Sequence, residues 1–148
     1  MRTTVRINPA SRVLSDHGLD RGGDVQKFWT VTVMRHMQRR MPYRSGLMIK
    51  RMIAATDLSK PLIVIPGPEV RMLYHGKVMV DPQTGAAGFL TADGWKSRKG
   101  VKKSISNRDI EYTTTKNPEA GPYWDRRTKA ADMPAMAREM QAYIDRRG

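Results

Sequence analysis

The sequence predicts a single α+β domain, because segments with helical spacing and segments with strand-like patterns both occur along a chain of single-domain length. With 148 residues, the chain can build one core that buries about two-thirds of the surface its unfolded form exposes. Apolar residues repeat at helical spacing over 25–41 and 133–144, whereas 70–80 and 109–114 resemble strands. The sequence contains no visible internal repeat or second domain.

The first predicted elements are a strand and a long helix. The opening "TTVRI" alternates polar and apolar residues before an Asn-Pro step, which predicts a half-buried strand. A helix is expected from Val25 to about Met41, with Asp24 as its N-cap and Pro42 as its end. Its apolar stripe consists of Val25, Phe28, Trp29, Thr32, Val33, His36 and Met37.

A second, shorter helix is predicted in "SGLMIKRMIAAT", capped near Ser45. Met48 and Met52 stand four residues apart in it, as do its two isoleucines. The 11 methionines of the chain could instead form an adaptable binding surface. The same spacing in Met136 and Met140 favours packing in a core.

Strands are predicted over 62–65, which is apolar and β-branched, and over 70–80, with a break at Gly76. A further strand is expected in "RDIEYTTT", residues 108–115, which alternates with one wet face. Between them, the segment 81–106 is rich in glycine, proline and positive charge. We expect it to be a long loop or arm that is ordered chiefly by neighbouring molecules.

The chain is expected to end in a helix. "NPEAGPYWDRR" is a turn-rich approach to a short helical piece. Asp132 is the expected N-cap of the last helix, with Pro134 in its tolerant first turn. The apolar stripe of this helix consists of Met133, Met136, Ala137, Met140, Tyr143 and Ile144.

Composition limits the partners and the compartment. The 27 Lys and Arg residues exceed the 14 Asp and Glu residues and give a formal charge of +13, which favours a negatively charged partner. The absence of cysteine excludes a disulfide framework, a thiolate nucleophile and a Cys-based zinc site. No apolar stretch is long enough to span a membrane, and no signal peptide is visible, so we expect a soluble protein made in the cytoplasm.

The densest positive charge lies in "GWKSRKGVKKS", where glycine and serine favour a loop. Either a solvated mobile loop or a surface that contacts phosphates would explain it. The tryptophans are not interleaved with basic residues, as a base-stacking platform would require. The candidate contacts with DNA or an acidic partner are Lys96, Arg98, Lys99, Lys102 and Lys103.

Residues with catalytic potential do not converge. His17, His36 and His75 lie far apart without metal-binding spacing, and His36 on an apolar helix face is favoured as a core residue. The sequence has neither a phosphate-binding loop nor a nucleophile elbow. Asp109 and Glu111 share one face of a predicted strand and are expected in solvent. We therefore do not expect an enzyme, a metal or a cofactor.

The stretch "GPEVRMLYHGKVMVDP" places an apolar run beside a Tyr-His-Gly-Lys step. A ligand-binding loop and a strand that turns sharply would both explain these four residues. In the second case Gly76 would bend the strand or take a positive φ, and Tyr74 and His75 would present opposite faces.

In the order of its motifs, the chain resembles a family of minor capsid proteins that are encoded beside the portal in tailed bacteriophages. Proteins of this family are components of the head-tail connector. The resemblance covers nearly the whole chain: "RRMPYRSGLM" ends the first helix, the stretch above follows, and "IEYTTTKNPEAGPYWDRR" leads into the last helix. Proteins of this family are similar to the tail-completion proteins that form a ring in the neck, between the head-closing ring and the tail. This resemblance implies a long helix packed on a curved antiparallel sheet and favours the turn at Gly76.

Residues in three parts of the chain match the motif of this family. The chain departs from the family pattern at Glu69 and Val70. The positions that match are Pro42, Gly46, Pro68, Arg71, Tyr74, Gly76, Lys77, Gly121, Pro122 and Trp124.

The resemblance implies a structural role without an active site. We expect a subunit of a homo-oligomeric ring in the phage neck, within the virion, between the DNA-filled head and the tail. The implied partners are copies of the chain, the head-closing and tail-terminating neck proteins, and DNA in the lumen. The alternative is a basic nucleic-acid-binding accessory protein, whose gene need not lie between portal and tail genes.

Overall fold

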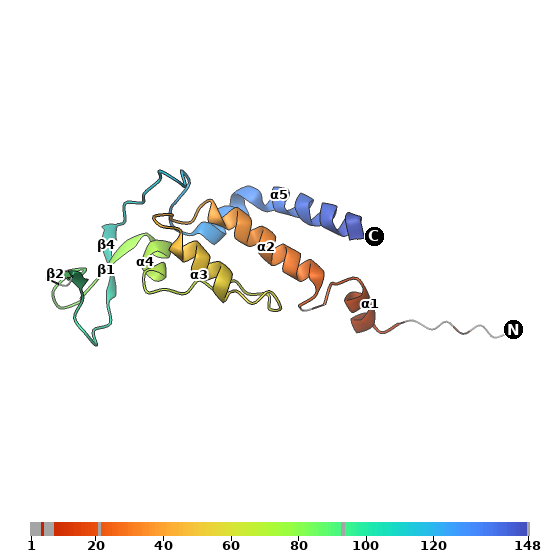
Figure 1. Ribbon diagram of the computed structural model, residues 1–148, viewed down its shortest axis with the longest axis horizontal. Helices are drawn as coiled ribbons and strands as arrows, with labels where there is room; N and C mark the ends of the chain where they lie inside the picture. Colours follow the sequence, from red (N-terminus) through yellow and green to blue (C-terminus); the bar gives the residue numbers. More distant parts are fainter. Residues whose placement is uncertain (1–3, 5–7, 21, 93, 148) are drawn as a thin grey trace.

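The chain folds into a group of helices from which two small sheets project (Figure 1). The structure is a computed structural model that describes residues 4, 8–20, 22–92 and 94–147. Its helices are α1 (Ala10–Asp16), α2 (Asp24–Gln38), α3 (Leu47–Ala55), α4 (Val70–His75) and α5 (Trp124–Arg147). Its strands are β1 (Lys77–Val80), β2 (Phe89–Thr91), β3 (Gly94–Lys96) and β4 (Ser104–Asp109).

The predicted α+β fold, with a long N-terminal helix packed on a curved antiparallel sheet, is wrong. The strands form only the antiparallel pairs β1–β4 and β2–β3. The 15-residue α2 packs against α5 instead of a sheet, and the seven-residue α1 before it buries none of its side chains. The predicted strand at 3–7 lies outside the described residues apart from residue 4. The described fold is mainly helical.

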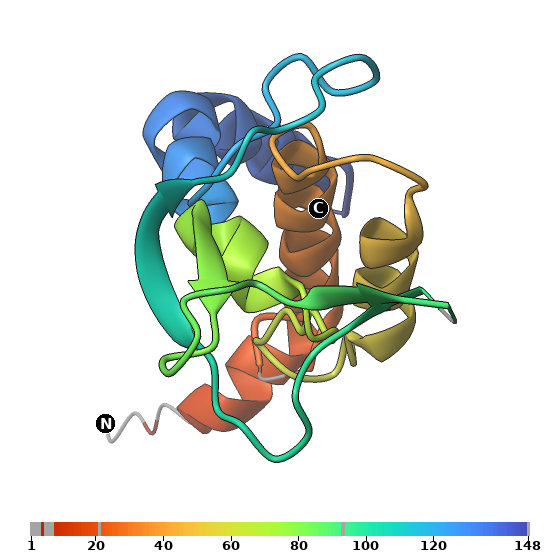
Figure 2. The same cartoon turned by 90° about the vertical axis from the view of Figure 1, so that its left-hand side faces the viewer.

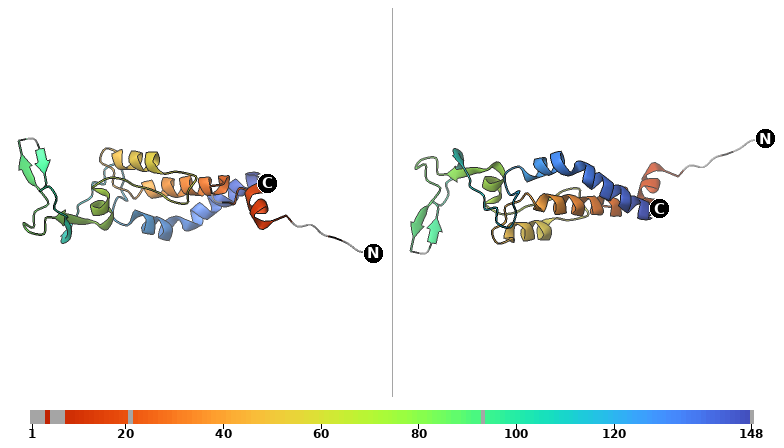
Figure 3. Two further views of the ribbon diagram at one scale, coloured as in Figure 1. Left: turned by 90° about the horizontal axis from the view of Figure 1, so that it is seen from below. Right: turned by 90° about the horizontal axis from the view of Figure 1, so that it is seen from above.

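α2 is the central helix and lies between α3 and α5 (Figure 3). Gly23 takes the N-cap position, so Asp24 is the first helical residue and not the predicted cap. The helix ends at Gln38, before Pro42 is reached. Its buried residues are Val25, Thr30, Thr32, Met34, His36 and Met37.

The hydrophobic core is built mainly from methionines, whose unbranched side chains adapt to irregular space. The cluster consists of Met34, Met37, Met41, Met48, Ile49, Met52 and Trp124. The packing predicted from the spacing of Met48 and Met52 is confirmed. Ile49 and Ile53, the second pair at this spacing, both lie in α3, where Ile49 is buried and Ile53 is 54% exposed.

The predicted strand over 62–65 is also wrong. The segment pairs with no strand of the described chain; the Val64 amide donates to the Thr56 hydroxyl at 3.2 Å, and that hydroxyl donates to the Val64 carbonyl at 3.4 Å. Ile63 and Ile65 pack against the core, whereas Leu62 is exposed. The apolar, β-branched sequence of 62–65 therefore marks an extended segment with one buried side.

The segment 70–75 is a helix and not the predicted strand. Val70, Leu73 and Tyr74 pack on the core at positions i, i+3 and i+4, which is the spacing of a helix face. Gly76 ends α4 as its C-cap with a φ of 70°, and β1 begins at the next residue. The positive φ expected at Gly76 is confirmed, but it ends a helix instead of bending a strand.

The strand predicted over 109–114 is displaced toward the N-terminus. β4 ends at Asp109, close to the start of the predicted strand. The Ile110 amide then donates to the Gly76 carbonyl at 2.9 Å, and the Tyr112 hydroxyl donates to the Leu73 carbonyl. These bonds draw 110–112 toward the end of α4, so Asp109 and Glu111 do not share the face of one strand.

α5 is longer than the predicted last helix. It begins at Trp124 and has 24 residues, so Asp132 and Pro134 lie in its interior and not at its start. Pro134 has no amide hydrogen for the helical bond, and α5 changes direction along its length (Figure 3). Tyr143 near its end stacks on Phe28 of α2, with the ring centroids 4.1 Å apart.

The molecule is elongated, with helices along most of its length and the strands at one end (Figure 1). Figure 2 looks along the long axis from the strand end. We call residues 77–109, which contain β1 to β4, the arm, and helices α2 to α5 the body. Within the described ranges, none of the helices is both long and apolar enough to cross a bilayer.

Two neighbouring residues of α3 test the core. Met52→Ala should lower the free energy of unfolding by about 2 to 5 kcal/mol, because it empties a site where the side chain is fully buried. Ile53→Ala should change it by less than about 0.5 kcal/mol, because that side chain is mostly in solvent. Urea denaturation measures both variants, and equal losses would mean that α3 presents a different face to the core.

Candidate assembly site

Residues far apart in the sequence meet where the arm leaves the body. At Gly76, a side chain would place its Cβ 3.2 Å from Pro122 Cβ and 3.2 Å from the Tyr112 hydroxyl. Glycine fits both this narrow space and the positive φ. We call this place the junction, and the motif residues that it brings together are Tyr74, Gly76, Lys77, Gly121, Pro122 and Trp124.

Trp124 anchors the first turn of α5 at the junction. It is 2% exposed, and its ring packs edge-on against Tyr74 with the centroids 5.1 Å apart. The Tyr123 amide donates to the Tyr74 carbonyl at 2.9 Å, and the Tyr74 hydroxyl donates to Asp125 Oδ1 at 2.8 Å. Burial, together with the bond to Asp125, raises the pKa of the Tyr74 hydroxyl. These contacts fix α4 to α5.

The segment before α5 is held to the end of α2 by backbone acceptors. The Gly121 amide and the Arg127 guanidinium donate to the Arg40 carbonyl at 3.2 and 3.1 Å. The Asn117 side-chain amide donates to the carbonyls of Gln38 and Met41, both at 2.9 Å. The orphan carbonyls at the end of α2 thus gain partners from a distant segment.

The base of the arm is closed by bonds between its two ends. Lys77 at the start of β1 forms an ion pair with Asp109 at the end of β4. The bond from the Ile110 amide to the Gly76 carbonyl lies next to it. The ribbon β1–β4 therefore begins as a defined extension of α4 and the junction.

The far part of the arm is closed by a second ion pair, between Asp81 and Arg98. Arg98 Nε and Nη2 lie 2.6 and 2.9 Å from the two oxygens of Asp81, and Arg98 Nη1 donates to Gln83 Oε1 at 2.8 Å. Asp81 also accepts the Gln83 amide at 2.8 Å and is only 7% exposed. The bond from Arg98 lowers the pKa of the Asp81 carboxyl.

The five basic residues predicted to contact DNA or an acidic partner have different settings. Arg98 is engaged by Asp81, and the Lys103 ammonium donates to the Ala87 carbonyl, so both contribute to the arm's own structure. Lys99 and Lys102 are exposed and have no partner among the described residues. Lys96 is exposed as well. The surface predicted for a partner thus contains two residues that already hold the arm.

The remaining motif residues lie outside the junction. Pro42 and Gly46 line a groove of about 380 Å³ beside it. Gly46 is the N-cap of α3 with a φ of 77°, and a Cβ there would lie 2.7 Å from the Tyr43 hydroxyl. Pro68 and Arg71 are exposed and belong to neither place.

The facing sides of α2 and α5 carry a polar cluster that the sequence analysis missed. The Arg40 guanidinium donates to both oxygens of Asp132 at 2.9 Å and to the Thr128 hydroxyl at 3.4 Å. The ring nitrogens of His36 lie 2.9 Å from Asp132 Oδ2 and 2.6 Å from Glu139 Oε1. Asp132 and Glu139 are seven residues apart, which is the available signal that they share a face of α5.

The cluster is buried and joins the two helices. His36 and Arg40 are 3% and 7% exposed. The hydrogen bonds from Arg40, and then from His36, hold the pKa of Asp132 well below its usual range. The bond from His36, and then that from Arg35, lowers the pKa of Glu139. His36 is therefore a core residue with hydrogen-bonded partners, which is the setting that the sequence favoured.

The site is best described as a structural attachment for the arm. Among the described residues there is no group of His, Cys, Asp or Glu that could hold a metal ion. No protein-family model, curated protein or solved structure matches the chain.

Acid should destabilise the protein through the polar cluster. A carboxylate whose pKa is lowered by folding stabilises the protein above its unfolded pKa and loses this contribution as the pH falls toward the folded pKa. Because the pKa values of Asp132 and Glu139 are lowered, the free energy of unfolding should fall between about pH 5 and pH 2. Urea denaturation over this range measures the loss.

Two asparagine variants locate the source of that pH dependence. Asp132→Asn should be about 3 kcal/mol less stable at pH 7, because Arg40 stays buried without its carboxylate. Its stability should also vary less with pH. Asp145→Asn, on the exposed end of α5, should keep the wild-type profile. An unchanged pH profile in Asp132→Asn would mean that other groups cause the acid loss.

Arg98 forms the ion pair with Asp81, whereas the adjacent Lys99 does not, so we expect their substitution to have different effects. Arg98→Ala should let elastase cut residues 81–88 several times faster, because Asp81 loses the partner that closes this part of the arm. Lys99→Ala should be cut at the wild-type rate, because Lys99 is exposed and forms no hydrogen bond or ion pair with the described residues. Equal rates in all three proteins would show that the ion pair does not close the arm.

Proposed function

We propose that the chain is a structural subunit of a homo-oligomeric ring in the neck of a tailed bacteriophage, in a minor capsid, head-tail connector or tail-completion role. The observation that carries the proposal is the arm, which stands at the end of the molecule away from the helices (Figures 1 and 3). A projecting element on a folded body is suited to contact with a neighbouring subunit.

The strand β4 of the arm is poorly buried within its own chain. All residues of β4 except Ser106 are exposed, including Ile105 at 42%. A two-stranded ribbon is marginally stable in water, and its outer edges leave backbone groups free to pair with another chain. Contact with a neighbour would cover this ribbon and its edges. The proposal thus gives the arm the burial that the body does not supply.

The arm and the body also suit a ring, because they offer two different surfaces for a contact between copies. When an arm on one copy contacts a body on the next, the contact is head-to-tail and repeats around a closed ring if the rotation closes. The net charge of +13 would attract packaged DNA or acidic neighbouring rings. The partners in this role are copies of the chain, the adjoining neck proteins and DNA, and the role needs no catalytic step or cofactor.

A second candidate, a basic nucleic-acid-binding accessory protein, is favoured by the exposed Lys99 and Lys102. Such a protein would bind DNA as a monomer or small oligomer. Its affinity would fall steeply with salt, with a log–log slope of about 0.9 for each phosphate neutralised. A ring subunit would instead keep its subunit contacts when these two lysines are removed.

Coexpression of the chain with the genes that flank its own tests the proposal. Electron microscopy of the purified assembly should show several copies of the chain in a closed ring between a portal and a tail component. A Lys99→Ala/Lys102→Ala variant should enter the ring with an unchanged number of copies. A chain that is absent from the assembly and copurifies with DNA would contradict the proposal and favour the accessory protein.

A further inference from the structure

The groove beside the junction is an apolar recess with a defined wall. It has a volume of about 380 Å³ and lies between the turn after α2, the helix α4 and the segment that follows β4. Met48, Leu73 and Ile110 line it, together with the rings of Tyr43 and Tyr112. Three separate parts of the chain therefore form a surface that can receive apolar side chains.

The groove also carries charge that is not used within the chain. Glu69 on its lining is paired with Arg51 at 2.6 Å. Glu111 is exposed and has neither an ion-pair nor a hydrogen-bond partner among the described residues. Arg44, also on the lining, is exposed and unpaired within the same ranges. Glu111 is thus the groove's free carboxylate, and Arg44 offers a control of opposite charge.

The arm has the complementary properties. Its hairpin pairs β2 only with β3, so both outer edges are free of other described strands. The hairpin sequence contains Phe89, Leu90 and Trp95, and the loop after it exposes Lys99 and Lys102 without described partners. The arm therefore combines apolar residues, open backbone edges and free ammonium groups.

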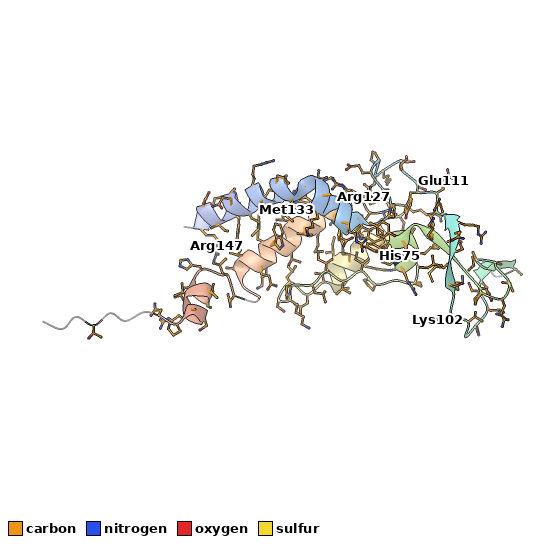
Figure 4. All side chains as sticks on the ribbon, turned by 180° about the vertical axis from the view of Figure 1, so that it is seen from behind. His75, Lys102, Glu111, Arg127, Met133 and Arg147 are labelled. Atoms are coloured by element: carbon orange, nitrogen blue, oxygen red, sulfur yellow. The ribbon has the colours of Figure 1, made fainter. Side chains whose placement is uncertain are left out.

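The arm and groove of one copy do not meet each other. Figure 4 shows Lys102 and Glu111 at opposite ends of the ribbon that β4 forms, and Figure 3 shows the arm directed away from the helices. The ion pair of Lys77 with Asp109 holds the ribbon in this direction at its base. An arm can therefore fill the groove only if it belongs to another molecule.

We propose that the groove binds the β2–β3 hairpin of a second copy of this chain, with Glu111 facing Lys99 and Lys102 of that copy. This inference rests on the proposed ring function and names the contact that joins its subunits. The apolar recess receives the apolar hairpin, and the free carboxylate meets the free ammonium groups. Because arm and groove lie at different places on one chain, the contact repeats from copy to copy.

Charge reversal in the coexpressed assembly tests the electrostatic part. Glu111→Lys should reduce the amount of chain in rings by roughly tenfold or more, because like charges would face each other. Adding Lys99→Glu and Lys102→Glu to that variant should restore rings. Arg44→Glu, the control on the same groove, should leave rings intact. If Arg44→Glu removes rings and Glu111→Lys does not, the assigned charge pairing is wrong and the proposal fails.

Introduced cysteines test the contact directly, because the chain has no cysteine of its own. Ala92→Cys lies in the turn of the hairpin and Thr113→Cys lies in the groove lining, and both residues are exposed. Rings assembled from equal amounts of the two single variants should give a covalent dimer with a short bismaleimide. The double variant should give a ladder of oligomers. Ala142→Cys, exposed on α5, should not join to Ala92→Cys.

The outcomes separate the contact from the ring function. Rings that form without Ala92–Thr113 cross-links, and that tolerate Glu111→Lys, would overturn the contact while leaving the ring proposal in place. A wild-type chain that never enters a ring would overturn both. A ladder in the double variant, with charge rescue, supports the contact.

Discussion

The ion pair between Arg40 and Asp132 places α5 against α2, and the remaining structure depends on this placement. Arg40 is 7% exposed, so its charge is stabilised inside the protein by the two bonds to Asp132, each 2.9 Å long. The carbonyl of the same residue accepts the Gly121 amide and the Arg127 guanidinium. Arg40 therefore holds both the middle of α5 and the segment that leads into it.

The position of the arm follows from that placement. With α5 fixed, Trp124 packs on Tyr74 and holds α4, and Pro122 comes close enough to Gly76 that a Cβ there would be crowded. Gly76 then ends α4 and sends the chain into β1. Local bonds in the arm complete its shape, while β4 stays largely exposed. An elongated molecule with an outlying arm results, and this is the feature from which a ring contact is proposed.

Part of this architecture was predictable from local chemistry. Helical spacing predicted α2 and α3, and the glycine at position 76 predicted a positive φ. The apolar, β-branched run at 62–65 and the alternation at 109–114 both misled, because an extended segment with one buried side can show the same residue types as a strand with partners. The segment 70–75 carried helical spacing in Val70, Leu73 and Tyr74, which the alternation of Val70, Met72 and Tyr74 obscured. The partner of Asp132 could not be predicted, because Arg40 is 92 residues away in sequence.

The central claim is that the arm is completed by a neighbouring copy. Hydrogen exchange, followed by mass spectrometry on the free subunit and on the assembled particle, measures this for the backbone of the arm. Peptides that cover β2, β3 and β4 should exchange quickly in the free subunit and be protected in the particle, while peptides from α2 and α5 should be protected in both. Equal exchange of the arm in the two states would contradict the claim.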